Sequence, residues 1–140
     1  MKVLIDTNVI IDFLITREPF CMASSKIIEK CACGEIKGYI AFHSISNLWY
    51  ILRKFPEDKR RAWMKDLCSF MRVTGASHEE VVKAVEMETF SDFEDCLQDR
   101  CAESIEEEYI ITRNVVDFAG SEVTAISPED FFKVEFGIAL

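Results

Sequence analysis

The stretch MKVLIDTN, residues 1–8, decides the fold that we expect for this chain. Its Val3-Leu4-Ile5 segment is apolar, favours β structure and is too short to be a helix. The turn-favouring residues Asp6-Thr7-Asn8 follow directly, so the pattern predicts a buried strand that ends at Asp6. We expect this strand to be the central one of a parallel sheet.

Outward from this strand, helical and β-favouring patterns alternate along the chain. Helices are predicted over residues 8–16, 20–33, 45–54, 58–70, 78–88 and 92–107, and a last helix opens at Ser127-Pro128-Glu129. Further strands are predicted at residues 37–41, 71–73, 109–112 and 123–126. Gly34 is expected to end the second helix, and Ser44 is expected to cap the third. Alternating strands and helices predict an α/β fold with a parallel sheet.

Size and composition narrow the class of protein. A chain of 140 residues fits one domain, and 49% hydrophobic with 29% charged residues is typical of a soluble globular protein. No apolar run approaches the roughly 18 residues that a membrane span needs. The amino terminus lacks the small-residue cleavage site of a secretory signal, so we expect a cytoplasmic protein with reduced cysteines.

The charge of the chain is unevenly distributed. A net charge of −9 argues against a protein that wraps nucleic acid with a broadly basic surface. Residues 53–65 nevertheless hold six basic residues against two acids, a local balance of +4. A solvated helix face and a phosphate-binding patch explain this segment equally well. If it binds phosphate, the candidate contacts are Arg53, Lys54, Arg60 and Arg61.

Three polar clusters follow predicted strands or open a predicted helix. They are Asp6-Thr7-Asn8, the segment 92–99, and Thr112-Arg113-Asn114 with Asp117. In open parallel sheets, ligands bind beyond the carboxyl ends of the strands, where helix amino termini also point. A site that activates water for phosphodiester cleavage brings carboxylates from distant parts of the chain around a hard cation. The clusters meet that requirement.

Each acid also has a structural explanation. Asp6 is in place to cap the helix that follows it, and Asp117 suits a surface turn. The spacing of Asp92, Asp95 and Asp99 puts them on one face of a helix, as is typical of a face exposed to solvent. On the helical wheel alone, this structural explanation is favoured over a functional one. Asp12 interrupts an almost wholly apolar helix, so it needs a partner or an opening, in a structural role or beside a site.

Four motifs in the expected order resemble the PIN domain family, and together they cover almost the whole chain. Residues 3–10, VLIDTNVI, resemble the opening of PIN domains. Residues 92–98, DFEDCLQ, and residues 50–54, YILRK, resemble the later acidic motif and the middle helix of one PIN subgroup. Ile111-Thr112-Arg113-Asn114 with Asp117-Phe118 resembles the last motif.

The resemblance implies a Rossmann-like, three-layer α/β/α sandwich with about five strands. It also implies magnesium- or manganese-dependent cleavage of single-stranded RNA, often as the toxin of a toxin–antitoxin pair. Asp6 and Asp95 would then be the main metal ligands, and Asp117 would join them as a catalytic residue. The residues that would line the site are Thr7, Asn8, Asp12, Asn47, Asp92, Glu94, Thr112 and Asn114.

Two positions depart from the family pattern. Asn47 and Asn114 stand where many PIN nucleases have acids. Both changes remove negative charge, which lowers metal affinity and puts a second metal position in doubt. Asp92 or Glu94 is placed to compensate.

We considered three hypotheses for the function that this pattern indicates. The leading hypothesis is a metal-dependent ribonuclease, and the second is a degenerate PIN scaffold that binds protein or RNA without cutting. A haloacid-dehalogenase-type phosphatase ranks low, because that pattern has an Asp where this chain has Asn8. A receiver domain ranks low too, because it requires a phospho-acceptor Asp after a middle strand and a lysine on a late loop, and neither is evident. Trp49, Tyr50 and Trp63 are expected to pack in the core; if exposed, they suggest a homodimer face or a groove for an antitoxin helix.

Overall fold

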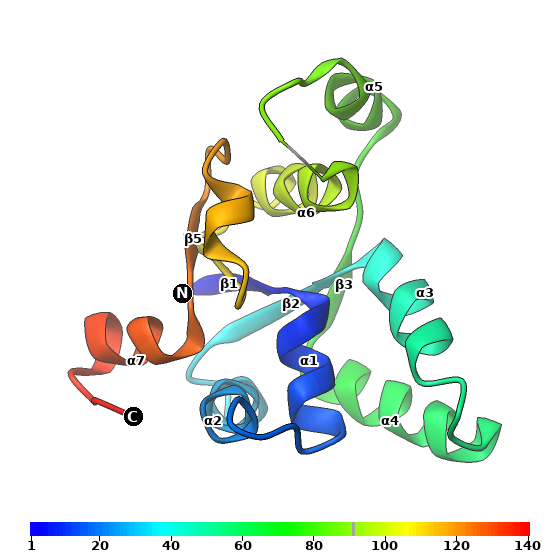
Figure 1. Cartoon of the computed structure of the whole chain (residues 1–140), viewed down its shortest axis with the longest axis vertical. Helices are drawn as coiled ribbons and strands as arrows, with labels where there is room; N and C mark the ends of the chain where they lie inside the picture. The colour runs from blue at the N-terminus through cyan, green and yellow to red at the C-terminus, as the bar shows by residue number, and fades with distance from the viewer. Residues whose placement is uncertain (91) are drawn as a thin grey trace.

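A five-stranded parallel sheet forms the centre of the computed structural model, which describes residues 1–90 and 92–140 (Figure 1). The strands are β1 (Lys2–Ile5), β2 (Lys37–Ala41), β3 (Arg72–Thr74), β4 (Tyr109–Ile111) and β5 (Thr124–Ile126). Their order is β3-β2-β1-β4-β5, so β1 is central, as the sequence predicts. The strand order reverses at β1, and in open α/β sheets such a reversal opens a crevice at the carboxyl ends of the strands.

Strand β1 is buried on both of its faces. Val3, Leu4 and Ile5 are all fully buried. Val3 and Ile5 belong to one hydrophobic core cluster and Leu4 to the other, as the alternation of side chains along a strand requires. A continuous apolar run is therefore the expected sequence for this position.

Helices cover both faces of the sheet. They are α1 (Thr7–Leu14), α2 (Cys21–Ala32), α3 (Phe42–Ile51), α4 (Glu57–Phe70), α5 (His78–Glu86), α6 (Phe93–Ser104) and α7 (Pro128–Phe136), with a 3-10 helix η1 (Val115–Phe118). Figure 1 shows α1, α2 and α4 on one side of the sheet and α5 and α6 on the other. The three-layer sandwich implied by the resemblance is confirmed. None of the described helices combines the length and hydropathy that crossing a membrane would require.

Gly34 ends α2 as predicted, but the start of α3 differs from the prediction. Gly34 adopts a left-handed φ of +83° just past the helix, a conformation that glycine takes at little cost. Ser44, however, is not the cap of α3. The N-cap is Ala41, because β2 passes into the helix without a loop, and Ser44 lies inside α3 and is fully buried.

The predicted solvated face of α6 is wrong at Asp99. Asp99 and Arg100 are both fully buried, and the Asp99 carboxylate accepts a hydrogen bond from Arg100 at 2.8 Å. The helix packs against α5, η1 and the sheet, which leaves this part of the stripe no access to water. Phe93, in the first turn of the same helix, is in contrast 52% exposed. A helical wheel separates polar from apolar faces but does not say which of them is covered.

Glu107, between α6 and β4, is a buried carboxylate whose oxygens have no hydrogen-bond partner among the described groups. Burial raises its pKa from 4.5 to about 9, and Lys2 offsets only part of that effect. Between pH 4.5 and about pH 9, the Glu107 carboxyl is ionised in the unfolded chain and protonated in the folded chain. The free energy of unfolding should therefore fall as the pH rises from 4.5 towards 9.

We expect Glu107→Gln to stabilise the protein at neutral pH by about 2–3 kcal/mol, since each unit of pKa shift is worth about 1.4 kcal/mol. Urea unfolding followed by circular dichroism at pH 7 and pH 4 measures the difference, which should vanish at pH 4, where both states are protonated. Glu108→Gln, at the exposed neighbouring residue, is the control. Equal stability of Glu107→Gln and wild type at pH 7 would contradict the prediction.

Candidate functional site

Asp6 lies where the central strand ends and α1 begins. It is the N-cap of α1, and its Oδ1 accepts the Thr7 backbone N–H at 2.7 Å. Its Oδ2 accepts from Thr112 Oγ1 at 2.8 Å and from Asn8 Nδ2 at 3.2 Å. Burial raises the pKa of the Asp6 carboxyl, and the Thr112 hydrogen bond offsets part of the rise. The sequence left helix capping and a place in the functional site as alternative roles for Asp6, and the structure is compatible with both.

The loop after β4 closes over the same strand end. Asn8 Oδ1 accepts the Arg113 backbone N–H at 3.3 Å, and Thr112 Oγ1 accepts the Asn114 N–H at 3.0 Å. Asp117 follows in η1 and is exposed. The hydrogen bonds that hold this loop to Asp6 and Asn8 thus bring the last polar cluster to the first.

The first turn of α6 brings the third cluster. Asp92 is the N-cap of α6, and its Oδ1 accepts the backbone N–H groups of Glu94 at 2.8 Å and Asp95 at 3.4 Å. Burial and, after it, the nearby carboxylates of Asp6, Asp92 and Asp117 together raise the pKa of Asp95 from 3.8 to about 7. Acids of the other two segments thus contribute to the pKa shift of an acid in α6.

The three clusters line one open pocket of about 260 Å³. Its walls hold Asp6, Thr7, Asn8, Ile11, Ile51, Asp92, Glu94, Asp95, Asn114 and Asp117. Most of the residues singled out from the sequence are therefore brought together at the carboxyl edge of the sheet. The apolar wall formed by Ile11 and Ile51 was not predicted, because no polar pattern marks these residues.

Asp12, Asn47 and Thr112 are not among the residues that line this pocket. Asp12 is fully buried and pairs with Arg113, with 2.5 Å from Nε to Oδ2, while Arg17 lies 3.7 Å away. Asn47 donates to Glu94 Oε1 at 2.7 Å. Thr112 is fully buried and binds Asp6. These three side chains hold wall residues or the adjacent loop in place.

A family model of the PIN domain matches residues 2–116. This chain belongs to the PIN domain family. The match contains β1, the middle helices, the first turn of α6 and the loop after β4, and therefore all three acidic clusters except Asp117. A search of curated proteins finds no significant match to this PIN domain.

The solved structures similar to this PIN domain include bacterial toxins and toxin–antitoxin complexes. VapBC2 from Rickettsia felis, bound to a DNA fragment from its promoter, gives a TM-score of 0.69 at 14% identity over 91% of this chain and 98% of the other. A toxin–antitoxin complex from Klebsiella pneumoniae gives 0.69 at 20% identity, over 90% and 97%. VapC20 of Mycobacterium tuberculosis, described as a sarcin–ricin loop cleaving toxin, gives 0.69 at 14% identity, over 90% and 99%. At these identities the likeness concerns the fold.

The chemistry of the pocket in this PIN domain suits a hard divalent cation. Five carboxylates line it, and no lysine or arginine is among its described lining residues. Within the described part of the chain, no three His, Cys, Asp or Glu side chains are gathered closely enough to hold a metal ion by themselves. Mg²⁺ commonly binds through one or two carboxylates and keeps several waters, so this arrangement fits it.

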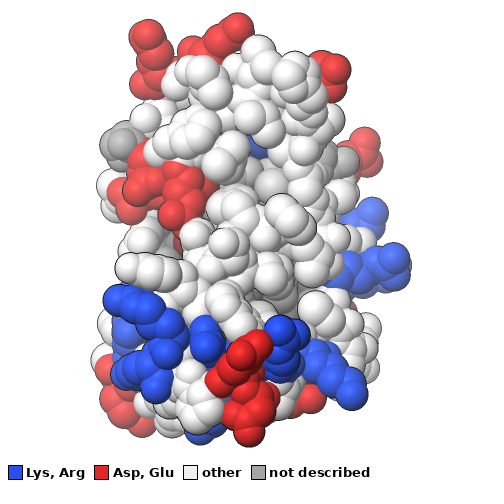
Figure 2. Space-filling view, turned by 90° about the vertical axis from the view of Figure 1, so that its right-hand side faces the viewer, with Lys and Arg blue, Asp and Glu red and all other residues white. Residues whose placement is uncertain are grey.

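The basic segment, residues 53–65, runs from just after α3 into α4. Arg53 stacks on Tyr50 at 4.1 Å, and Arg60 and Arg61 lie over the ring of Trp49 at 4.2 and 5.5 Å. On the face seen in Figure 2, a group of acidic side chains lies above a band of basic side chains, and further acidic side chains lie among the basic ones. Ile51, two residues before Arg53, lines the acidic pocket, so the basic segment adjoins it.

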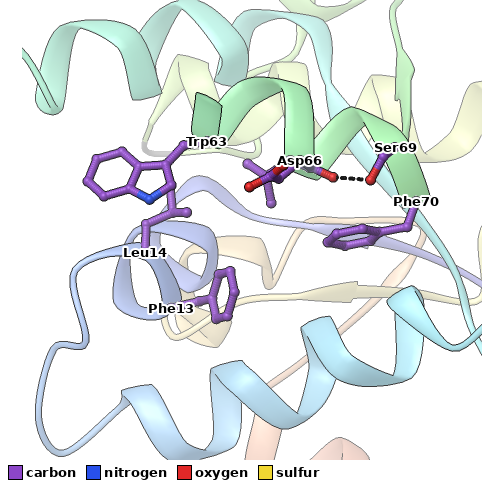
Figure 3. A pocket seen from close by; sticks show the side chains of 7 residues that line it. Phe13, Leu14, Trp63, Asp66, Ser69 and Phe70 are labelled. Atoms are coloured by element: carbon purple, nitrogen blue, oxygen red, sulfur yellow. Dashed lines mark hydrogen bonds between the residues drawn. The ribbon is translucent and has the colours of Figure 1, made fainter. Parts of the chain in front are cut away.

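The predicted core packing of the three aromatic residues is only partly right. Trp49 and Trp63 are half-buried, but Tyr50 is 64% exposed. Trp63 forms part of a separate groove of about 460 Å³ between α1 and α4. Figure 3 shows Phe13 and Leu14 of α1 facing Trp63 and Phe70 of α4 across it. The groove is lined mainly by apolar side chains and contains no residue of the acidic pocket.

Proposed function

We propose that this protein is a divalent-metal-dependent endoribonuclease of the toxin type that cleaves single-stranded RNA. The observation that carries the proposal is the convergence of Asp6, Asp95 and Asp117, from three distant segments, on one pocket at the sheet edge. Family membership supports it, and so does the fold shared with a toxin described as cleaving the sarcin–ricin loop.

The proposed roles follow from the contacts in the pocket. Asp6 and Asp95 would hold Mg²⁺ or Mn²⁺, which supplies an activated water and offsets charge on the phosphate. Thr112 keeps Asp6 Oδ2 in one orientation through its 2.8 Å hydrogen bond. Asn47 orients the Glu94 carboxylate, so an acid of α6 faces the pocket although Asn47 itself is neutral. The carboxylates of Asp117 and Asp92 add further negative charge to the pocket.

Substrate RNA would approach over the basic segment. Arg53, Lys54, Arg60 and Arg61 are the candidate phosphate contacts, and Ile51 connects this surface to the acidic pocket. Exposed Tyr50 offers a ring on which an unpaired base can stack. Binding through phosphates weakens as the salt concentration rises, so RNA affinity should fall with added salt.

Removal of divalent metal is expected to abolish cleavage. Wild-type protein should cut a labelled single-stranded RNA in Mn²⁺ or Mg²⁺ and leave it intact in EDTA, and added Mn²⁺ should restore cutting. A gel-based cleavage assay measures this. Cleavage that persists unchanged in EDTA would contradict the proposal, and no cleavage under any condition would favour a scaffold that binds RNA or protein without cutting.

An antitoxin partner is proposed for the groove between α1 and α4. The matched toxin–antitoxin structures support a partner of this kind. The walls formed by Phe13, Leu14, Trp63 and Phe70 suit the apolar face of an amphipathic helix. Lys59 lies 5.0 Å from the Trp63 ring and puts positive charge beside the groove, while Asp66 puts negative charge in its wall.

Leu14→Glu should weaken antitoxin binding strongly while leaving RNA cleavage intact, because it places a charge in the apolar groove but does not touch the acidic pocket. Co-expression with the antitoxin and calorimetry of the purified pair measure the affinity. Met22→Glu, at an exposed apolar residue of α2 outside the groove, is the matched control. Equal affinities of the two variants would contradict the assignment.

A homodimer remains a further proposal. Phe42 and Tyr50 on α3 are 71% and 64% exposed, and large exposed aromatic residues are enriched at protein interfaces. Light scattering on the purified protein would give the mass of a dimer if the proposal holds and that of a monomer if it does not.

A further inference from the structure

The carboxylates proposed to hold metal come from helices on opposite faces of the sheet. Asp6 caps α1, whose apolar residues Val9 and Ile10 belong to one core cluster. Asp95 lies in α6, whose Cys101 and Ala102 belong to the other. The sheet separates the two helices over most of their length, so they approach each other only beyond the strand ends (Figure 1).

A buried chain of hydrogen bonds joins these two helices at that edge. Thr7 Oγ1 donates to Ser44 Oγ at 2.8 Å, and Gln98 Nε2 donates to the same oxygen at 2.7 Å. Ser44 and Gln98 are fully buried, and Thr7 is 7% exposed. Ser44 belongs to α3, which leaves the sheet at the end of β2, the neighbour of β1. The chain therefore runs from α1 through α3 to α6.

Both ends of this chain are close to the acids in sequence and in space. Thr7 follows Asp6, and its backbone N–H donates to Asp6 Oδ1 at 2.7 Å while its side chain binds Ser44. Gln98 lies three residues after Asp95, which is one turn along the same face of α6. A shift of Ser44 would thus be transmitted to the carboxylates on both helices.

We propose that Ser44 and Gln98 are positioning residues that set the separation of the Asp6 and Asp95 carboxylates. Three polar side chains buried together give little net stability compared with apolar residues of similar shape. What they fix is the relative orientation of three helices, because hydrogen bonds are directional and apolar contacts are not. The inference rests on the proposed function, since it assigns that separation to metal binding.

The test measures Mn²⁺ affinity by calorimetry in wild type, Ser44→Ala, Ser44→Thr and Gln98→Met. Mutation of a group that holds a metal-ligating side chain in place typically lowers metal affinity by about 10–100-fold. We therefore expect Ser44→Ala and Gln98→Met to lose about 10-fold or more in Mn²⁺ affinity. Ser44→Thr keeps the hydroxyl and should retain most of the affinity. Ile28→Val, in the buried core of α2, serves as the control for a loss of thermal stability without a change at the site.

Wild-type affinity in both Ser44→Ala and Gln98→Met would overturn the inference while leaving the proposed function intact. If wild type itself binds no Mn²⁺, the proposed function fails, and the positional claim is then decided by crystal structures of wild type and Gln98→Met. A changed distance between the Asp6 and Asp95 carboxylates in Gln98→Met supports the claim, and an unchanged distance overturns it.

Discussion

Asp6→Asn is expected to lower the rate of Mn²⁺-dependent RNA cleavage by about 100- to 1,000-fold, because charge stabilisation by a bound metal is worth several kcal/mol and each 1.4 kcal/mol is tenfold in rate. Asparagine removes the negative charge of a proposed ligand with almost no change of shape. It is also a good N-cap, so α1 should still form. The loss should therefore appear in the rate and in Mn²⁺ affinity, with a much smaller effect on folding.

The cleavage assay needs a control for the loss of one negative charge. Asp130→Asn serves this purpose, because Asp130 is an exposed residue in the first turn of α7, outside the pocket. It should cleave RNA at the wild-type rate. If Asp6→Asn and wild type cleave at the same rate, Asp6 is not part of the catalytic machinery.

Arg113→Met is expected to destabilise the protein by about 3–5 kcal/mol, the cost of leaving a buried charge without its partner. Asp12 is fully buried, and Arg113 contacts both of its carboxylate oxygens. The aliphatic stem of methionine keeps part of the packing against Phe20, over which the guanidinium lies at 4.2 Å. The loss should thus come mainly from the buried Asp12 carboxylate, which then keeps only the 3.7 Å contact with Arg17.

Urea unfolding at pH 7 measures this loss, and two further variants test its cause. Asp12→Asn combined with Arg113→Met should recover part of the stability, because no buried charge is then left. Arg17→Met should cost less than about 1 kcal/mol, since Arg17 is 47% exposed and 3.7 Å from Asp12. A loss below 1 kcal/mol for Arg113→Met would show that the pair contributes little.

Much of the fold follows from local patterns. The apolar run of β1, the turn at Asp6 and the glycine after α2 each predict their element, and the alternation of elements predicts a parallel sheet. The polar residues that follow strands are then brought to one edge by topology alone. For this reason Asp6, Asn8, Asn114 and Asp117 could be placed together before the structure was known.

Features that depend on which faces pack together could not be predicted. Asp99 looks solvated on a helical wheel, but it is buried beside Arg100 because α6 is covered on several sides. Ser44 has the sequence signature of a cap, yet β2 runs directly into α3 and buries it. The bond between Asn47 and Glu94 joins residues 47 positions apart, and no local pattern indicates such a contact.

A crystal structure of the protein grown with Mn²⁺ tests most directly whether the acidic pocket binds a divalent metal. We expect an anomalous peak in the pocket, within bonding distance of oxygens from Asp6 and Asp95, and no such peak in Asp6→Asn. A well-ordered pocket with no peak at saturating Mn²⁺, or a peak bound only by other residues, would contradict it.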